Sequence, residues 1–259
     1  MKIAVIGYGV VGKHMAADIE RADHEAVVFD VRSIERHNAD RQEVNACAAA
    51  FVCVSTPSAP DGSCDTGAVD DVFTWLRVPV AIIRSTVPPG TTDRLAAGLA
   101  GCVVFCPEFI GEGVNAPYNA MRQPPFIILG GASDARKAAA LVLHALYNSE
   151  CALVAMEAVE AEVCKYAENF FLATKVSWAN DVYRVSEKVG ADPHVVLAAL
   201  GHDYRIGRSH THVDPTHPGW GGRCLPKDTA ALLALVGAET APLLAAVREV
   251  NEIHRGKSA

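Results

Sequence analysis

The sequence predicts an α/β fold in which an N-terminal doubly wound parallel sheet is followed by an all-helical domain with one long helix. Seven short runs are nearly continuous in apolar character, as expected for strands buried on both faces of a parallel sheet. Helical patterns lie between several of these runs, and such alternation favours this type of sheet. A long stretch without Gly or Pro then indicates the change to helices.

The predicted elements follow the chain in that order. The strands are expected at Lys2–Ile6, Ala26–Phe29, Phe51–Val54, Val80–Ile83, Val103–Cys106, Phe126–Leu129 and Ala152–Ala155. Helices between them include Val11–Arg21, Thr92–Leu99 and Asp134–Tyr147. One helix of roughly thirty residues is expected from Val159 to Val189, followed by shorter helices through Leu200, at Pro226–Val236 and at Ala241–Arg255. We therefore predict an N-terminal domain over residues 1–156 and a helical domain over residues 157–259.

Composition limits the possible partners. The chain has 259 residues, of which 50% are hydrophobic and 20% charged, and this is ordinary globular usage rather than disorder or coiled coil. The formal net charge of −7 disfavours nucleic acid and anionic membranes as partners. No apolar run reaches the roughly 18 residues that a membrane span requires. A small-molecule substrate is therefore expected.

Two further features predict a cytoplasmic location. The apolar start of the chain is interrupted by glycines and by Lys13, so we interpret it as a first strand rather than an export signal. The eight cysteines form no CxxC pair and are expected to be reduced thiols rather than a disulfide framework.

A glycine motif follows the first predicted strand. Its residues match GxGxxG: Gly7, Tyr8, Gly9, Val10, Val11 and Gly12. In such a loop the first glycine permits the tight turn, the second admits a pyrophosphate and the third allows close packing of the helix on the strand. Asp30 ends the second strand, where a carboxylate bonds the adenosine ribose and favours NAD over NADP, although Arg32 acts against that preference. The alternative is a glycine turn without a ligand, with Asp30 as a solvated strand end.

The most specific segment is GWGGRCLPKD, which contains Gly221, Cys224 and Asp228. Pro226 is expected to begin a helix, so Cys224 would lie just before a helix N-terminus that stabilises a thiolate. Asp228 lies one turn farther along. The arrangement suits a nucleophile in covalent catalysis, while a buried structural cysteine is the alternative.

Polar residues elsewhere suggest the rest of a site. Glu162, Lys165 and Asn169 share one face of the long helix, where desolvation would make Lys165 a usable acid or base; a lysine paired with Glu162 is the alternative. Other polar residues follow three consecutive strands, where ligands bind in open α/β sheets, although hydroxyls there also serve as plain helix caps. They are Ser55 and Thr56, then Thr86, then Glu108 and Glu112, with the apolar Phe109 beside Glu108.

The chain resembles the UDP-glucose/GDP-mannose dehydrogenase family, whose blocks it carries in order: GYGVVG, VSTPSAPDG, STVPPGTT, CPEFIGEG, EAEVCKYAENFFLATKVSWAND, RIG and GWGGRCLPKDT. The resemblance implies an NAD-dependent oxidoreductase that converts a sugar-nucleotide primary alcohol to a carboxylate through a cysteine-linked intermediate. It covers nearly the whole chain.

The resemblance also implies roles for single residues. Cys224 would trap the aldehyde as a thiohemiacetal, and Lys165 and Asn169 would stabilise the oxyanion. Thr86 and Asp228 would hold a catalytic water, and Glu108 would act as acid or base in thioester hydrolysis. Arg205 would reach the substrate of a partner subunit, which implies a homodimer built on the long helix. The predicted substrate-binding residues are Glu108, Phe109, Glu112, Lys165, Asn169, Arg205, Gly221 and Cys224, and the cofactor contacts are those of the glycine loop, Asp30, Ser55, Thr56 and Thr86.

Two departures leave alternatives open. Family enzymes carry a third, C-terminal nucleotide-binding domain, which we expect to be missing from this chain or supplied by a separate one. The loop before the cysteine carries His210, His212 and His217 without compact ligand spacing, so no metal is predicted.

Two other functions stay open. A two-electron β-hydroxyacid-type dehydrogenase would not need Cys224. A catalytically silent NAD-binding or partner-binding protein would need none of the catalytic set.

Overall fold

The structure is a computed structural model that describes residues 1–32, 35–99, 101–109, 125–147 and 151–256. The chain divides into two compact units. The first contains Met1–Pro57 and Cys64–Lys165, and the second contains Ser58–Ser63 and Tyr166–Ala259. The first turns of the long helix thus belong to the first unit, because Ala161 and Cys164 pack in its core.

The first unit is built on a seven-stranded sheet with the order β2-β1-β3-β4-β5-β6-β7. The strands are β1 (Lys2–Ile6), β2 (Glu25–Phe29), β3 (Ala49–Val52), β4 (Val80–Ile83), β5 (Cys102–Phe105), β6 (Phe126–Gly130) and β7 (Ala152–Met156). Strands β1 to β5 are mutually parallel. The chain leaves β1 toward β2 and returns on the other side at β3, so the order reverses at β1 and β3. The predicted fold class is confirmed.

One strand pair differs from the predicted parallel sheet. Strands β5 and β6 are antiparallel and meet at Phe105 and Gly130, whereas β6 and β7 are parallel to each other. The direction of β6 was not predictable because a continuous apolar run has the same pattern in both directions. Strand β3 also ends at Val52, two residues before the predicted Val54.

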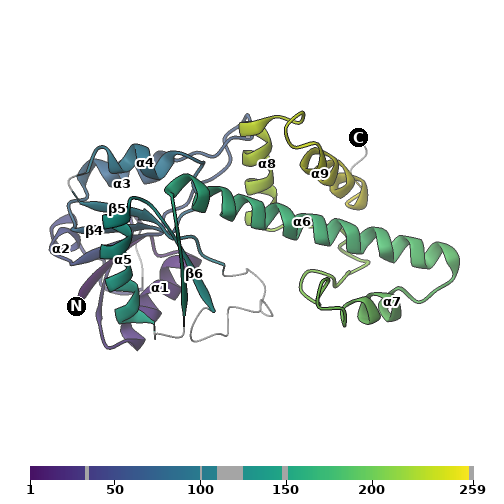
Figure 1. Ribbon diagram of the computed structural model, residues 1–259, viewed down its shortest axis with the longest axis horizontal. Helices are drawn as coiled ribbons and strands as arrows, with labels where there is room; N and C mark the ends of the chain where they lie inside the picture. The colour runs from purple at the N-terminus through teal and green to yellow at the C-terminus, as the bar shows by residue number, and fades with distance from the viewer. Residues whose placement is uncertain (33–34, 100, 110–124, 148–150, 257–259) are drawn as a thin grey trace. The chain divides into compact units, whose positions relative to one another are not determined.

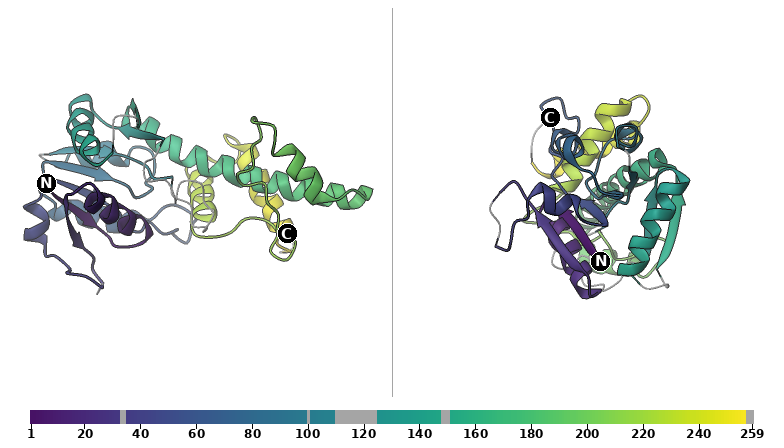
Figure 2. Two further views of the ribbon diagram at one scale, coloured as in Figure 1. Left: turned by 90° about the horizontal axis from the view of Figure 1, so that it is seen from below. Right: turned by 90° about the vertical axis from the view of Figure 1, so that its left-hand side faces the viewer.

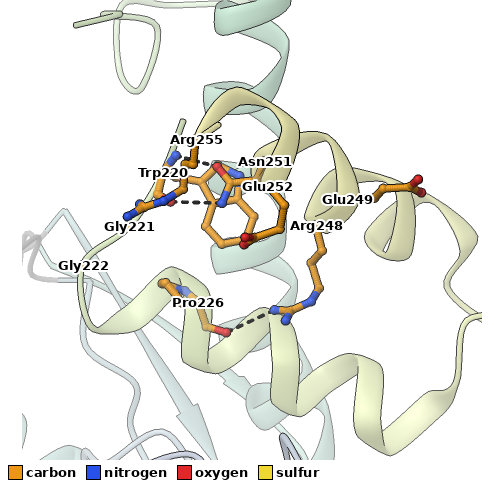
Figure 3. A pocket seen from close by; sticks show the side chains of 9 residues that line it. All are labelled: Trp220, Gly221, Gly222, Pro226, Arg248, Glu249, Asn251, Glu252 and Arg255. Atoms are coloured by element: carbon orange, nitrogen blue, oxygen red, sulfur yellow. Dashed lines mark hydrogen bonds between the residues drawn. The ribbon is translucent and has the colours of Figure 1, made fainter. Parts of the chain in front are cut away.

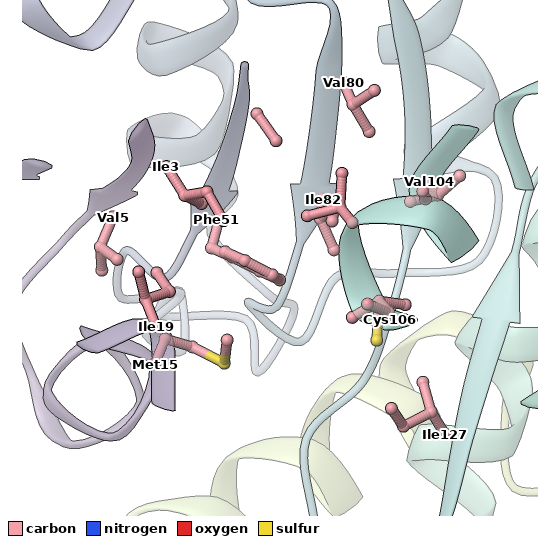
Figure 4. Close-up of a cluster of buried hydrophobic side chains, with 14 of the residues drawn as sticks. Ile3, Val5, Met15, Ile19, Phe51, Val80, Ile82, Val104, Cys106 and Ile127 are labelled. Carbon is pink, nitrogen blue, oxygen red and sulfur yellow. The ribbon is translucent and has the colours of Figure 1, made fainter. Parts of the chain in front are cut away.

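Helices cover both faces of the sheet (Figure 1, Figure 2). On one face, α1 (Val10–Arg21) and α5 (Ser133–Leu146) pack against alternate strand residues such as Ile3, Phe51 and Ile82, and Figure 4 shows Met15 and Ile19 of α1 pointing toward them. The other face is covered by α2 (Arg41–Asn45), α3 (Gly67–Trp75), α4 (Thr91–Ala96) and the start of α6. Period-two alternation places strand neighbours in opposite layers, and both layers are apolar.

Helices α2 and α3 were not predicted. The sequence did carry a signal for α2, because Asp40 and Glu43 form a reciprocal capping box at its start. The short helix offers too little periodicity to stand out without that cap.

The second unit is helical. Helix α6 (Ala158–Val189) continues into it from the first unit, and α7 (Pro193–Leu200), α8 (Cys224–Val236) and α9 (Pro242–His254) follow. Ala173 of α6 packs with Trp220 and Val247, while Ala179 packs with Leu197 and Val213. Helix α8 begins at Cys224 rather than at Pro226, and proline is still tolerated there because N–H groups of the first turn have no helical partner. Within the described residues, no helix combines the length and apolar character that a membrane span requires.

Candidate active site

The glycine loop joins β1 to α1 with the geometry that a dinucleotide requires. Gly7 has φ +93°, and a Cβ there would lie 2.7 Å from the Cys53 carbonyl oxygen. A Cβ on Gly12 would lie 1.9 Å from the Gly7 carbonyl oxygen, so helix and loop pack too closely for any side chain. A Cβ on Gly9 would meet nothing within 4 Å, which leaves open space at the start of α1. That space and the N-terminal N–H groups of α1 fit a pyrophosphate.

Asp30 follows β2 directly and is 6% exposed. Its carboxylate accepts the Tyr8 N–H at 2.8 Å, which ties it to the glycine loop. Burial by itself would raise the pKa of Asp30, but hydrogen bonds from Arg32 and Tyr8 outweigh burial and lower the pKa to about 2. An ionised carboxylate beside the glycine loop fits the ribose hydroxyls of NAD.

The other predicted strand-end residues lie at the same edge, because β1 to β5 are parallel and their carboxyl ends coincide. Thr56, which follows β3, donates from Oγ1 to the Thr86 carbonyl oxygen at 2.8 Å. Ser85 donates to the Val54 carbonyl oxygen at 2.6 Å, so two bonds cross between the loops after β3 and β4. Glu108, which follows β5, is buried.

The start of α6 is attached to this edge by Glu162 and Lys165. Glu162 is fully buried and accepts the Gly90 N–H at 2.6 Å, the Thr92 N–H at 2.8 Å and the Thr92 hydroxyl at 2.7 Å. Burial raises the pKa of Glu162. Lys165 is 5% exposed, and its Nζ lies 5.0 Å from the centre of the Phe109 ring. The sequence placed Glu162 and Lys165 on one helix face but gave no indication of the bonds from Glu162 to Gly90 and Thr92 at the start of α4.

In the second unit, two separate motifs meet at Asp228. Asn169 of α6 donates from Nδ2 to Asp228 Oδ2 at 2.5 Å, and Lys227 forms an ion pair with Oδ1. Asp228 is 1% exposed. The structure therefore brings the predicted Asn169 and Asp228 into contact, although 59 residues separate them.

Cys224 is the first residue of α8 and is half-buried. The loop before Cys224, residues 219–223, includes Gly221 and is held in place through Trp220. The Trp220 N–H donates to Asn251 Oδ1 at 2.7 Å, and the indole N–H donates to Ser177 Oγ at 2.9 Å. A cavity of about 400 Å³ lies between this loop and α9, with Asn251 pointing at Trp220 (Figure 3). Sequence reasoning missed Asn251 and Ser177, since no local pattern links them to the cysteine.

The remaining predicted residues have less structural support. Arg205 is exposed and pairs with Asp203 at 2.6 Å. Ser55 is exposed after β3. Glu112 lies outside the described residues. Among those described, no group of three His, Cys, Asp or Glu side chains is arranged to hold a metal ion.

A glycine loop, an acidic residue after the second strand and a helical unit define a dinucleotide-binding α/β protein. The chain belongs to the UDP-glucose/GDP-mannose dehydrogenase family, whose NAD binding domain matches residues 32–149 and whose central domain matches residues 159–253. The predicted family and the predicted cofactor, NAD, are thereby confirmed.

Several proteins are similar over nearly the whole chain. The putative UDP-glucose 6-dehydrogenase YtcA of Bacillus subtilis is 30% identical, over 99% of this chain and 68% of its own length. UDP-glucose 6-dehydrogenase AglM of Haloferax volcanii is 31% identical, over 97% of this chain and 70% of its own length. The solved UDP-glucose dehydrogenase of Pyrobaculum islandicum has a TM-score of 0.80 and 30% identity, over 97% of this chain and 68% of that one. This chain thus spans about two thirds of the length of these relatives.

A smaller enzyme shares the fold alone. The 3-hydroxyisobutyrate dehydrogenase of Mycobacterium tuberculosis has a TM-score of 0.68 at 17% identity, and the match covers 98% of this chain and 94% of that one.

Proposed function

We propose that this chain oxidises the primary alcohol of a sugar nucleotide, or of a related substrate, to a carboxylate through a thioester on Cys224. The observation that carries the proposal is the bond between Asn169 and Asp228, because it joins the two motifs that the chemistry requires. Relatives named UDP-glucose 6-dehydrogenases support the substrate class.

The first oxidation converts the alcohol to an aldehyde by loss of a proton and a hydride. NAD, when bound, takes up the hydride that leaves the substrate carbon in each of the two oxidations. Lys165 and Asn169 lie four residues apart on α6, so both can donate hydrogen bonds from the same helix face. Asn169 has a second amide N–H to offer, since one N–H serves Asp228.

The second oxidation needs a nucleophile. An aldehyde carbon has little hydride to give until a group adds to it. The Cys224 thiolate forms the new C–S bond while the carbonyl π pair moves to oxygen, and Lys165 and Asn169 stabilise that oxyanion. When the hydride leaves, the carbonyl re-forms and a thioester remains on Cys224. The N-terminal N–H groups of α8 favour the thiolate at this position.

Hydrolysis then restores the thiolate. Glu108 takes a proton from a water that Thr86 and Asp228 hold, the oxygen attacks the thioester carbon and the C–S bond breaks. The released carboxylate and the thiolate complete the balance: one alcohol and one water lose two hydrides and three protons in all.

A homodimer on α6 is part of this proposal. Phe171, Trp178 and Val185 recur every seven residues along α6 and are exposed by 60%, 36% and 62%. An apolar stripe of this spacing favours packing against a second helix. Arg205, exposed in one subunit, is the residue proposed to reach the other subunit's substrate.

The test of the reaction is NADH formation with UDP-glucose, GDP-mannose or a small 3-hydroxy acid as the substrate. We expect turnover with a sugar nucleotide, loss of turnover in Cys224→Ala and normal turnover in Cys102→Ala. Cys102 is a matched control because it is also half-buried but begins β5, at the opposite end from Glu108. Turnover with the hydroxy acid alone would replace the proposal with the β-hydroxyacid-type reaction. NAD binding without any turnover would leave a silent cofactor-binding protein.

Hybrid dimers test the shared site. Mixing Arg205→Ala and Cys224→Ala chains should recover part of the activity, because one site in each hybrid keeps both residues. No recovery despite demonstrated subunit exchange would contradict the proposed role of Arg205.

A further inference from the structure

At the adenosine end of the cofactor site, the Asp30 carboxylate is paired with the Arg32 guanidinium. Arg32 donates from its backbone N–H to Asp30 Oδ1 at 2.8 Å, from Nε to the same oxygen at 3.1 Å and from Nη2 to Oδ2 at 3.2 Å. Tyr8 donates to Oδ2 from its backbone N–H. Both oxygens therefore have partners, and one of the partners is positively charged.

The charge at this position decides whether a 2′-phosphate is accepted. A carboxylate after the second strand repels the phosphate, whereas an arginine in the same place accommodates it. The Asp30 side chain is 4% exposed and the Arg32 side chain 71% exposed. The carboxylate is fixed in the fold, while most of the arginine side chain is open to solvent and to a ligand.

Two other cations lie near the glycine loop but have different carboxylate partners. Lys13 pairs with Glu35 at 2.7 Å, and Arg36 pairs with Glu20 at 2.8 Å. Of these three cations, Arg32 is the one whose partner is the ribose-binding carboxylate itself. The Arg32 guanidinium therefore lies where the 2′-hydroxyl of NAD or the 2′-phosphate of NADP would meet Asp30.

We propose that Arg32 determines cofactor specificity and allows this chain to bind NADP in addition to NAD. With NAD, the ribose hydroxyls donate to Asp30 and the Arg32 side chain turns toward solvent. With NADP, the guanidinium remains beside Asp30, offsets its charge and donates to the 2′-phosphate oxygens. Cofactor recognition by Arg32 is independent of the chemistry assigned to Cys224.

Calorimetric titration of the whole chain with NAD and with NADP tests this role without any turnover. The wild type should bind NADP within about tenfold of its affinity for NAD, because the guanidinium offsets the charge of Asp30. Arg32→Ala should weaken NADP about tenfold or more, as expected for lost hydrogen bonds between charged groups. The same variant should change NAD binding by less than about threefold, since an exposed ion pair contributes little.

The matched control is Arg21→Ala, which also removes one arginine but lies in the last turn of α1, away from the glycine loop. It should leave both affinities unchanged. Arg32→Lys keeps the charge and should retain part of the NADP binding. Absence of NADP binding by the wild type, equal weakening of both cofactors in Arg32→Ala, or a lysine variant as weak as the alanine variant would each overturn the proposal.

Discussion

Replacing Glu162 should destabilise the first unit more than any exposed change on the same helix. The carboxylate is fully buried and serves three donors: the Gly90 N–H, the Thr92 N–H and the Thr92 hydroxyl. Thr92 is itself fully buried, so its two donors have no solvent to replace the lost acceptor. Gly90 is exposed, and water can satisfy its N–H in the variant.

The magnitude follows from those contacts. Each buried donor left without an acceptor costs about 1–3 kcal/mol, so the two donors of Thr92 give about 2–6 kcal/mol for Glu162→Ala. Burial raises the pKa of Glu162, which means that the ionised form carries a desolvation cost that the variant removes. We therefore expect a net loss of about 2–4 kcal/mol, or roughly 4–16 °C in Tm. Glu162→Gln keeps one acceptor oxygen for Thr92 but turns an N–H group toward Gly90, so its loss should be smaller.

Urea unfolding followed by circular dichroism measures the free energies of unfolding of the wild type, Glu162→Gln and Glu162→Ala, which should decrease in that order. Glu187→Ala is the control, because Glu187 is exposed on the same helix and its loss should cost no more than about 0.5 kcal/mol. The pH dependence adds a second readout. The folded state binds the Glu162 proton more tightly than the unfolded chain, so this group's contribution to stability falls as pH rises from about 4 to its raised pKa. The reasoning would be refuted if the wild type were no more stable than Glu162→Ala, or if Glu162→Gln were less stable than Glu162→Ala.

Two other predictions concern the cofactor loop and the cysteine loop. The pKa of Asp30 is lowered to about 2, so the ionised carboxylate should contribute about 1–2 kcal/mol of stability after allowing for the exposed Arg32. This contribution should be present above pH 4 and lost as pH falls toward 2. If the difference in unfolding free energy between wild type and Asp30→Asn stayed constant from pH 7 to pH 2, the prediction would be contradicted. Asn251→Ala removes two bonds to the Trp220 backbone, at 2.7 and 3.1 Å, and should cost about 2–4 kcal/mol with a change in tryptophan fluorescence; an unchanged unfolding midpoint would count against Asn251 as the anchor of the loop.

Elements with a strong local pattern were predictable from the sequence. All seven strands are nearly continuous apolar runs, and α6 is marked by the absence of Gly and Pro from Val159 to Val189. The glycine loop and Asp30 were found because their spacing is fixed by one strand, one turn and one helix. Strand direction at β6 was missed, since direction is set by how the chain returns to the sheet and not by the residues of the strand.

Contacts between distant segments were predictable only in part. Family resemblance assigned Asn169 to the oxyanion and Asp228 to the catalytic water, and the contact between these two residues across 59 positions is what the structure adds. The bonds from Glu162 to Gly90 and Thr92, and from Asn251 to Trp220, were missed because a buried polar residue finds its partner through packing, which no local pattern encodes.

The central claim is the oxidation in two steps through a thioester on Cys224, and the most direct measurement counts NADH released per carboxylate formed. A sugar nucleotide that turns over should give two NADH for each carboxylate, with no free aldehyde accumulating. Cys224→Ser should greatly slow net turnover and retain the acyl group as an ester, visible as added mass on the intact chain. One NADH per product, together with a Cys224→Ala variant as fast as the wild type, would contradict the account.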